Sequence, residues 1–268
     1  MSRQNIERIM DDQSIFAWQH YDPNEAQYTR YAESLPSVIA AGYKISNVYY
    51  SICSARASAY YSIIDDYGDL AGEGDTNHLY VQAHFLTSAI LEYALCLDMA
   101  WQVVWAYIQP SSFEYLVEQK NVELEKDCTR DSIISQLDCV ISMGGHGIQQ
   151  ASELRSILVK FDQEECVLKL RRLYNSIKHH SSIQIKGLGM IDDSFSVTIL
   201  GMKIKKLSRP VYTLDEIEEL LEQYHFKFVD FFNSIISKIM PDDYCNNSVP
   251  FIDFLNTALK MYSVQKRR

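Results

Sequence analysis

Apolar residues recur at three- and four-residue steps along most of this chain, which is the period of an amphipathic or buried α-helix. Capping boxes such as Asp22–Glu25 and Thr213–Glu216 mark helix starts, and prolines and paired glycines mark helix ends. The pattern predicts helices near residues 22–34, 37–66, 77–108, 112–125, 131–142, 148–160, 163–180, 214–239 and 249–262. The expected fold is therefore mainly α.

One segment departs from the helical period. Residues 183–206 alternate in polarity and carry β-branched side chains around an Asp192–Asp193 turn, which predicts a small β-hairpin. Because a two-stranded unit is marginal alone, this hairpin should lean on the helices. We expect a helical extension over 1–76, a helical domain with the hairpin over 77–240, and a C-terminal helix and tail over 241–268.

Composition favours a soluble protein of a reducing compartment. Of the 268 residues, 47% are hydrophobic and 22% are charged, which is ordinary for globular proteins. The six cysteines show no CxxC pair, and the N-terminal residues contain no apolar run typical of a secretory signal. The apolar segment 79–108 includes Gln82, His84, Glu92, Asp98 and Gln102, which predicts a buried helix instead of a membrane span. We expect a cytoplasmic protein without membrane contact.

The helix expected over 163–180 carries candidate chemistry. Its buried stripe should comprise the following apolar residues: Val167, Leu170, Leu173, Tyr174 and Ile177. Arg172 and His179 lie seven residues apart, which brings them within about 20° of one another around the helix axis. Asn175 lies between them on the same face, and Arg171 and Lys178 flank it. Arg172, Asn175 and His179 can therefore face one shared space.

These three residue types suit RNA cleavage without a metal. A histidine can take a proton from a ribose 2′-hydroxyl near neutral pH, and an arginine can stabilise the charge that grows on the phosphate. DNA lacks that hydroxyl and would be spared. The alternative is that these residues form an ordinary solvent-exposed face without a catalytic role. Basic residues in the last turns of a helix are favoured by its negative C-terminal end.

The charge distribution bears on this choice. The formal net charge is −10, which argues against general affinity for nucleic acid. Residues 160–210 nevertheless hold ten Lys and Arg against five Asp and Glu, a net charge of +5. A basic helix and hairpin on an acidic body predict a surface that suits a phosphate chain.

Residues 172–180 also resemble the motif of the HEPN superfamily, in which an Arg and an apolar residue precede a His near the end of a late helix. The ending Asn-Ser-Ile-Lys-His-His is typical of that motif's surroundings, and residues 84–107 are similar to the long aromatic helix that often precedes it. The resemblance covers about 77–240. In the commonest form of the motif an Arg directly precedes the Asn, whereas Tyr174 stands there in this chain.

The resemblance implies a HEPN-like helical bundle that forms a homodimer, with the Arg and His of both copies in one cleft. Many members are metal-independent endoribonucleases of toxin–antitoxin, abortive-infection or antiviral defence systems, and others are binding modules. The expected catalytic residues are Arg172, His179 and Asn175, and the expected RNA-binding residues are Arg171, Lys178, His180 and Lys186. No cofactor is expected, and the expected partners are RNA and a defence-system or antitoxin protein.

Other constellations are less informative. Glu222 and His225 form one ExxH step, but a di-iron site needs two such steps, so we interpret this one as a surface feature. His84 is more typical of a core histidine than of a metal ligand, and Asp75 of a helix cap. No metal site is predicted.

Two hypotheses remain open after these observations. The first is a metal-independent endoribonuclease, and the second is a non-catalytic HEPN-like module that binds a partner protein or nucleotide through the same basic groove. The Arg172–His179 alignment and the local positive charge favour the nuclease. The acidic net charge and Tyr174 favour the binding module.

Overall fold

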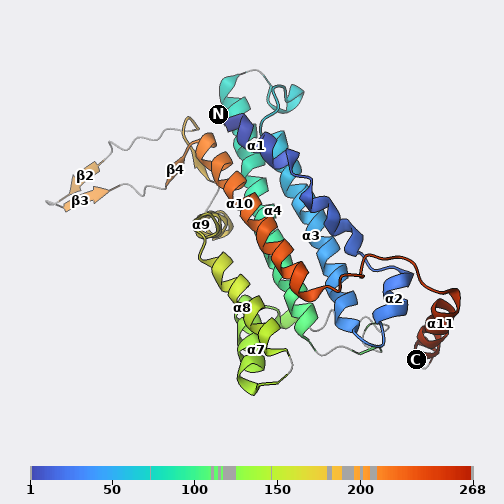
Figure 1. Ribbon diagram of the computed structural model, residues 1–268. Coiled ribbons are helices and arrows are strands. Elements are labelled where there is room, and N and C mark those ends of the chain that lie inside the picture. Colours follow the sequence, from blue (N-terminus) through green and yellow to red (C-terminus); the bar gives the residue numbers. More distant parts are fainter. Residues whose placement is uncertain are drawn as a thin grey trace. The chain divides into compact units, whose positions relative to one another are not determined.

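The computed structural model describes residues 2–72, 74–109, 112–113, 116, 125–145, 147–179, 183–188, 196–199, 202–205 and 210–266 (Figure 1). The α-helices of the described residues are α1 (Ser2–Asp11), α2 (Glu25–Tyr31), α3 (Pro36–Tyr61), α4 (Asp75–Ile108), α7 (Arg130–Met143), α8 (Ile148–Asp162), α9 (Glu165–His179), α10 (Leu214–Ile239) and α11 (Phe251–Gln265). Short 3₁₀ helices cover Ser14–Tyr21, Gly68–Leu70 and Glu125–Asp127. The prediction of a mainly α fold with a small β insertion is confirmed.

Most expected helices are found within a few residues of their predicted bounds, and the exceptions are at the N-terminal end. Helix α1 and the 3₁₀ helix Ser14–Tyr21 were not predicted, although they bury Ile6, Ile9, Ile15 and Trp18. The helix expected over 112–125 lies largely outside the described residues. These two helices have short apolar patterns and no clear N-terminal cap, so they were not predicted from the sequence.

Local capping explains two helix starts. Thr213 and Glu216 form the predicted capping box: the Thr213 backbone N–H donates to the Glu216 carboxylate at 2.7 Å, and the Glu216 N–H donates to the Thr213 hydroxyl at 3.2 Å. Helix α2 is capped by Asn24 and not by Asp22, because the Asn24 side chain accepts from the Ala26 N–H at 2.9 Å. The expected Asp22–Glu25 box is therefore wrong by two residues.

The β insertion contains two separate strand pairs. β2 (Ser196–Ile199) and β3 (Met202–Lys205) are antiparallel, with Val197 opposite Ile204, and this confirms a hairpin within 183–206. The observed connection lies between Ile199 and Met202, while the expected Asp192–Asp193 turn lies outside the described residues. β1 (Gln184–Ile185) and β4 (Val211–Tyr212) form a parallel pair that was not predicted.

The chain divides into two compact units. The first comprises Met1–Asp12, Cys53–Ala94 and Glu165–Phe226, and the second comprises Gln13–Ile52, Leu95–Glu164 and Lys227–Arg268. Helices α3, α4 and α10 contribute residues to both units. The expected domain boundaries at residues 76 and 240 remain a prediction.

The first unit buries apolar residues of α1, α3, α4, α9 and α10. Its core includes Ile6, Ile9, Ala55, Leu86, Ile90, Tyr93, Val167, Leu170, Leu173, Leu221 and Tyr224. Full burial of a Val, Leu or Ile side chain typically stabilises a fold by about 1.5–3 kcal/mol. Helix α9 is held in this unit by its apolar stripe, so its opposite face remains in solvent.

The second unit is organised around aromatic rings. Trp18 is almost fully buried, its ring lies edge-on to that of Phe232 with centroids 4.7 Å apart, and its indole N–H donates to the Asn233 side-chain oxygen at 2.8 Å. Phe161 of α8 stacks on Phe231 of α10 with centroids 4.0 Å apart. Helices α7 and α8 pack against each other within the same unit (Figure 1).

Helix α4 was predicted to be a buried helix, although it is long and apolar enough to span a membrane. Among the described residues it is the one helix long and apolar enough to cross a membrane, and 56% of its apolar window is buried inside the protein. Core helices of soluble proteins meet the same criteria of length and composition. This burial agrees with the prediction, made from the polar residues of segment 79–108, that the segment forms a buried helix.

Candidate functional site

Helix α9 carries the candidate residues and owes its position to its apolar face. Val167, Leu170 and Leu173 are buried, as predicted, together with Cys166. The expected stripe members Tyr174 and Ile177 are half-buried. This side of α9 packs into the first unit, and the side chains on the opposite side are exposed to solvent.

Arg172, Asn175 and His179 lie on the solvent face of α9 and all three are exposed. Within the part of the chain that the structure describes, none of their side chains has a hydrogen-bond or ion-pair partner. Seven residues of helix rise separate Arg172 from His179 by roughly 10 Å along the axis. The structure therefore presents three uncommitted polar side chains on one helical face, as the spacing predicted.

Other charges on α9 are already engaged. The Lys178 ammonium lies 5.7 Å from the centre of the Tyr174 ring, which is a cation–π distance. Lys169 forms an ion pair with Glu165 at 2.8 Å. Arg171 is half-buried, so it is less accessible than Arg172. Tyr174, which stands where the usual motif has an arginine, thus contacts one of the two expected RNA-binding residues on this helix.

The remaining expected RNA-binding residues lie beyond α9. His180 is outside the described residues. Lys186 is exposed in the turn after β1, and its backbone N–H donates to the Tyr212 carbonyl at 2.8 Å. Hydrogen bonds from Thr213 hold the pKa of the Glu216 carboxyl below its usual value, and the charge of Lys186 adds to this effect. Lys186 therefore lies near the start of α10.

The expectation that Glu222 and His225 lie on the surface is wrong. His225 is fully buried: its Nδ1 lies 2.9 Å from the Tyr93 hydroxyl and its Nε2 lies 3.1 Å from an Asp12 carboxylate oxygen. Glu222 is also buried and forms an ion pair with Arg8. His225 follows the buried Leu221 by four residues, a spacing that could have placed it in the core.

Burial has a clear electrostatic consequence at His225. Loss of hydration lowers its pKa to about 4, against the opposing effect of Asp12. The imidazole is therefore neutral at physiological pH. No group of three or more His, Cys, Asp or Glu side chains among the described residues could hold a metal ion. The buried histidine thus contributes to a hydrogen-bonded core.

The expectation that His84 is a core residue is also wrong, because its side chain is exposed on α4. It lines a hollow of the first unit between α4 and the segment 183–188, with a volume of about 430 Å³. The expected cap residue Asp75 is the first residue of α4, directly after Gly74. The exposed histidine therefore belongs to a concave surface that the helical pattern did not reveal.

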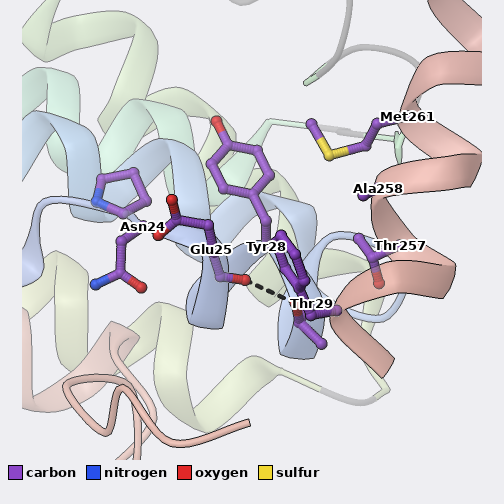
Figure 2. A pocket seen from close by; sticks show the side chains of 9 residues that line it. Asn24, Glu25, Tyr28, Thr29, Thr257, Ala258 and Met261 are labelled. Atoms are coloured by element: carbon purple, nitrogen blue, oxygen red, sulfur yellow. Dashed lines mark hydrogen bonds between the residues drawn. The ribbon is translucent and has the colours of Figure 1, made fainter. Parts of the chain in front are cut away.

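The second unit has a hollow of about 390 Å³ between α2 and α11 (Figure 2). Glu25 and Tyr28 line it from α2, and Met261 extends from α11 towards the Tyr28 ring. The hydroxyl of Thr29 donates to the Glu25 carbonyl at 2.7 Å. No Lys or Arg is among the residues that line this hollow, and the Glu25 carboxylate would repel a phosphate.

Comparisons with known proteins add no neighbour to this geometry. A scan against protein-family models and searches of curated proteins and of solved structures found no match to the chain.

Proposed function

We propose that this protein is a metal-independent endoribonuclease of the HEPN type, which acts in the cytoplasm as part of a defence or toxin–antitoxin system. The observation that carries the proposal is the solvent face of α9, where Arg172, Asn175 and His179 are exposed together and make no hydrogen bond or ion pair with the described residues. Residues 166–179 also contain no Asp or Glu that would repel RNA.

In the proposed reaction, His179 accepts the proton of a ribose 2′-hydroxyl. The 2′ oxygen then forms a bond to the adjacent phosphorus, and the bond from phosphorus to the 5′ oxygen of the next nucleotide breaks. The products are a 2′,3′-cyclic phosphate and a 5′-hydroxyl, whose proton comes from an imidazolium. Arg172 stabilises the charge on the phosphoryl oxygens, and Asn175 orients the phosphate by hydrogen bonding.

Two copies of the chain would complete this site. Arg172 and His179 are about 10 Å apart along one helix, and helical side chains incline towards the N-terminus, so the two groups of one copy do not converge readily on one phosphate. In a two-fold arrangement with antiparallel α9 helices, Arg172 faces His179 of the partner subunit. Leu168, a 41% exposed apolar residue on the same face, supports such a contact.

The second candidate function is a non-catalytic module that binds a partner protein or nucleotide through the same face. The contact between Tyr174 and Lys178 favours it, because the tyrosine takes the place of the usual arginine. The net charge of −10 favours it too, because an acidic body repels bulk RNA.

The test incubates purified protein with mixed cellular RNA in EDTA. Wild type should release fragments, His179→Ala should not, and His20→Ala should behave as wild type because it removes an exposed histidine far along the sequence from α9. Light scattering at micromolar concentration should report a dimer. RNA that stays intact but bound would favour the binding module, and RNA neither cut nor bound would overturn both functions.

A further inference from the structure

The hollow between α4 and the segment 183–188 has the character of a preformed binding site. Ile185 is buried, and the pairing of β1 with β4 fixes the segment through the hydrogen bond from the Lys186 N–H to the Tyr212 carbonyl. A turn follows in which the Leu188 N–H donates to the Ile185 carbonyl at 3.0 Å. The volume of about 430 Å³ lies within the usual range for small-ligand pockets.

Gly187 seats this turn on α4. Its φ of +96° lies in the left-handed region, and a Cβ at this position would come within 3.0 Å of the Leu79 side chain. The turn therefore lies close to the Leu79 side chain of α4, where a larger residue would be crowded.

Two polar side chains and one acceptor oxygen in the hollow are available to a ligand. Among the described residues, the side chains of His84 and Gln184 have no hydrogen-bond or ion-pair partner. The hydroxyl of Thr87 donates to the Ala83 carbonyl at 2.7 Å, which leaves its oxygen able to accept. Tyr80 lines the same hollow and is 65% exposed, so a large aromatic ring stays in water at the rim.

An exposed ring beside a free carboxamide suits a planar heterocycle. Nucleobases of single-stranded RNA are recognised by stacking on aromatic side chains and by hydrogen bonds to their edges, and a glutamine offers one donor and one acceptor side by side. The residues that line this hollow include no Asp or Glu, and the exposed Lys186 follows directly in the chain. The hollow of the second unit, with Glu25 in its wall, lacks this combination.

The hollow is also within reach of the proposed cleavage site. Because four peptide units separate His179 from Ile183, which lines the hollow, their Cα atoms are at most about 15 Å apart. A few nucleotides of an extended strand span such a distance. An RNA strand that enters the hollow can thus also reach the solvent face of α9.

We propose that this hollow binds one unpaired nucleobase of a single-stranded RNA, stacked on Tyr80 and hydrogen bonded by Gln184. The proposal rests on the proposed function, because it assigns part of the same RNA to a second site. Tyr80 supplies affinity that is tolerant of sequence, and Gln184 sets a preference among bases. Duplex RNA is excluded, because the base edge that would hydrogen bond with Gln184 is already used in base pairing.

The test measures binding of fluorescently labelled homopolymeric RNA oligonucleotides by anisotropy, with the His179→Ala protein as parent so that the RNA stays intact. Tyr80→Ala should weaken binding about 5- to 150-fold, because base stacking is worth roughly 1–3 kcal/mol. Tyr80→Phe should bind within about twofold of the parent, since it keeps the ring. Gln184→Leu should reduce the difference in affinity between base types.

The matched control is Tyr50→Ala, which removes a tyrosine of α3 that is 63% exposed and outside the hollow, and should bind like the parent. Unchanged affinity in Tyr80→Ala would overturn the base site, even if the wild type cuts RNA. Affinity that depends on Tyr80, in a wild type that cuts no RNA, would support the site and reject the nuclease. Parent protein that binds no oligonucleotide would reject the base site and remove the support for RNA as substrate.

Discussion

Replacing the buried His225 by glutamine should make the stability of this protein less sensitive to acid. The imidazole is fully buried between Tyr93 and Asp12, and burial lowers its pKa to about 4; Asp12 opposes this shift and the charge of Arg56 adds to it. In the unfolded chain a histidine titrates near its ordinary pKa of about 6.5. The folded and unfolded states therefore bind different numbers of protons between these two values.

The sign follows from proton linkage. As the pH falls through about 6.5, the unfolded chain takes up a proton at this histidine while the folded protein does not until about pH 4. The free energy of unfolding therefore decreases on acidification. With these two pKa values, the loss attributable to His225 between pH 7 and pH 5 is about 2 kcal/mol. At or above pH 7 the contribution is almost fully present.

Urea denaturation at pH 7 and pH 5 measures this effect in the wild type, His225→Gln and Tyr93→Phe. Other titrating groups act alike in all three proteins, so the difference between wild type and His225→Gln isolates the histidine. The glutamine variant should lose about 2 kcal/mol less on acidification than the wild type. Tyr93→Phe keeps the imidazole and should retain the steep dependence, at lower overall stability. An equal loss in wild type and His225→Gln would refute the reasoning.

Two further substitutions test the packing of the second unit. Gly42→Ala should destabilise the protein by about 1–3 kcal/mol. The new methyl group would overlap the hydroxyl of the buried Tyr244 and come within 2.6 Å of the Tyr21 carbonyl oxygen. A variant as stable as wild type in thermal denaturation would contradict this crowding. Asn233→Ala should lower the free energy of unfolding, measured by urea denaturation, by about 1–3 kcal/mol, because the buried indole N–H of Trp18 loses its acceptor. A decrease below about 0.5 kcal/mol would show that another group accepts this hydrogen bond.

The helical fold was readable from the sequence because long periodic segments between strong stop signals leave few alternatives. The buried stripe of α9 was predicted from Val167, Leu170 and Leu173, and the exposure of Arg172 and His179 followed from the same period. The parallel pairing of β1 and β4 could not be foreseen, because two-residue strands carry no periodic signal and their pairing depends on contacts distant in sequence.

Two histidines were placed wrongly from the sequence. His225 was expected at the surface and is buried, whereas His84 was expected in the core and is exposed. The imidazole is polar enough for the surface and small enough for a core, so its place depends on partners such as Tyr93 and Asp12 that lie far away in the sequence. The hollow beside His84 escaped prediction for the same reason, since its second wall comes from residues 183–188.

The central claim, cleavage of RNA by attack of the 2′-hydroxyl with His179 as base, is tested most directly by the ends of the products. Purified wild-type protein is incubated in EDTA with a synthetic RNA and with the same sequence as DNA, and the fragments are analysed by mass spectrometry. The account predicts RNA fragments that end in a 2′,3′-cyclic phosphate, a new 5′-hydroxyl on each downstream fragment, and intact DNA. Fragments that carry a 5′-phosphate and a free 3′-hydroxyl, or equal cleavage by His179→Ala, would contradict it.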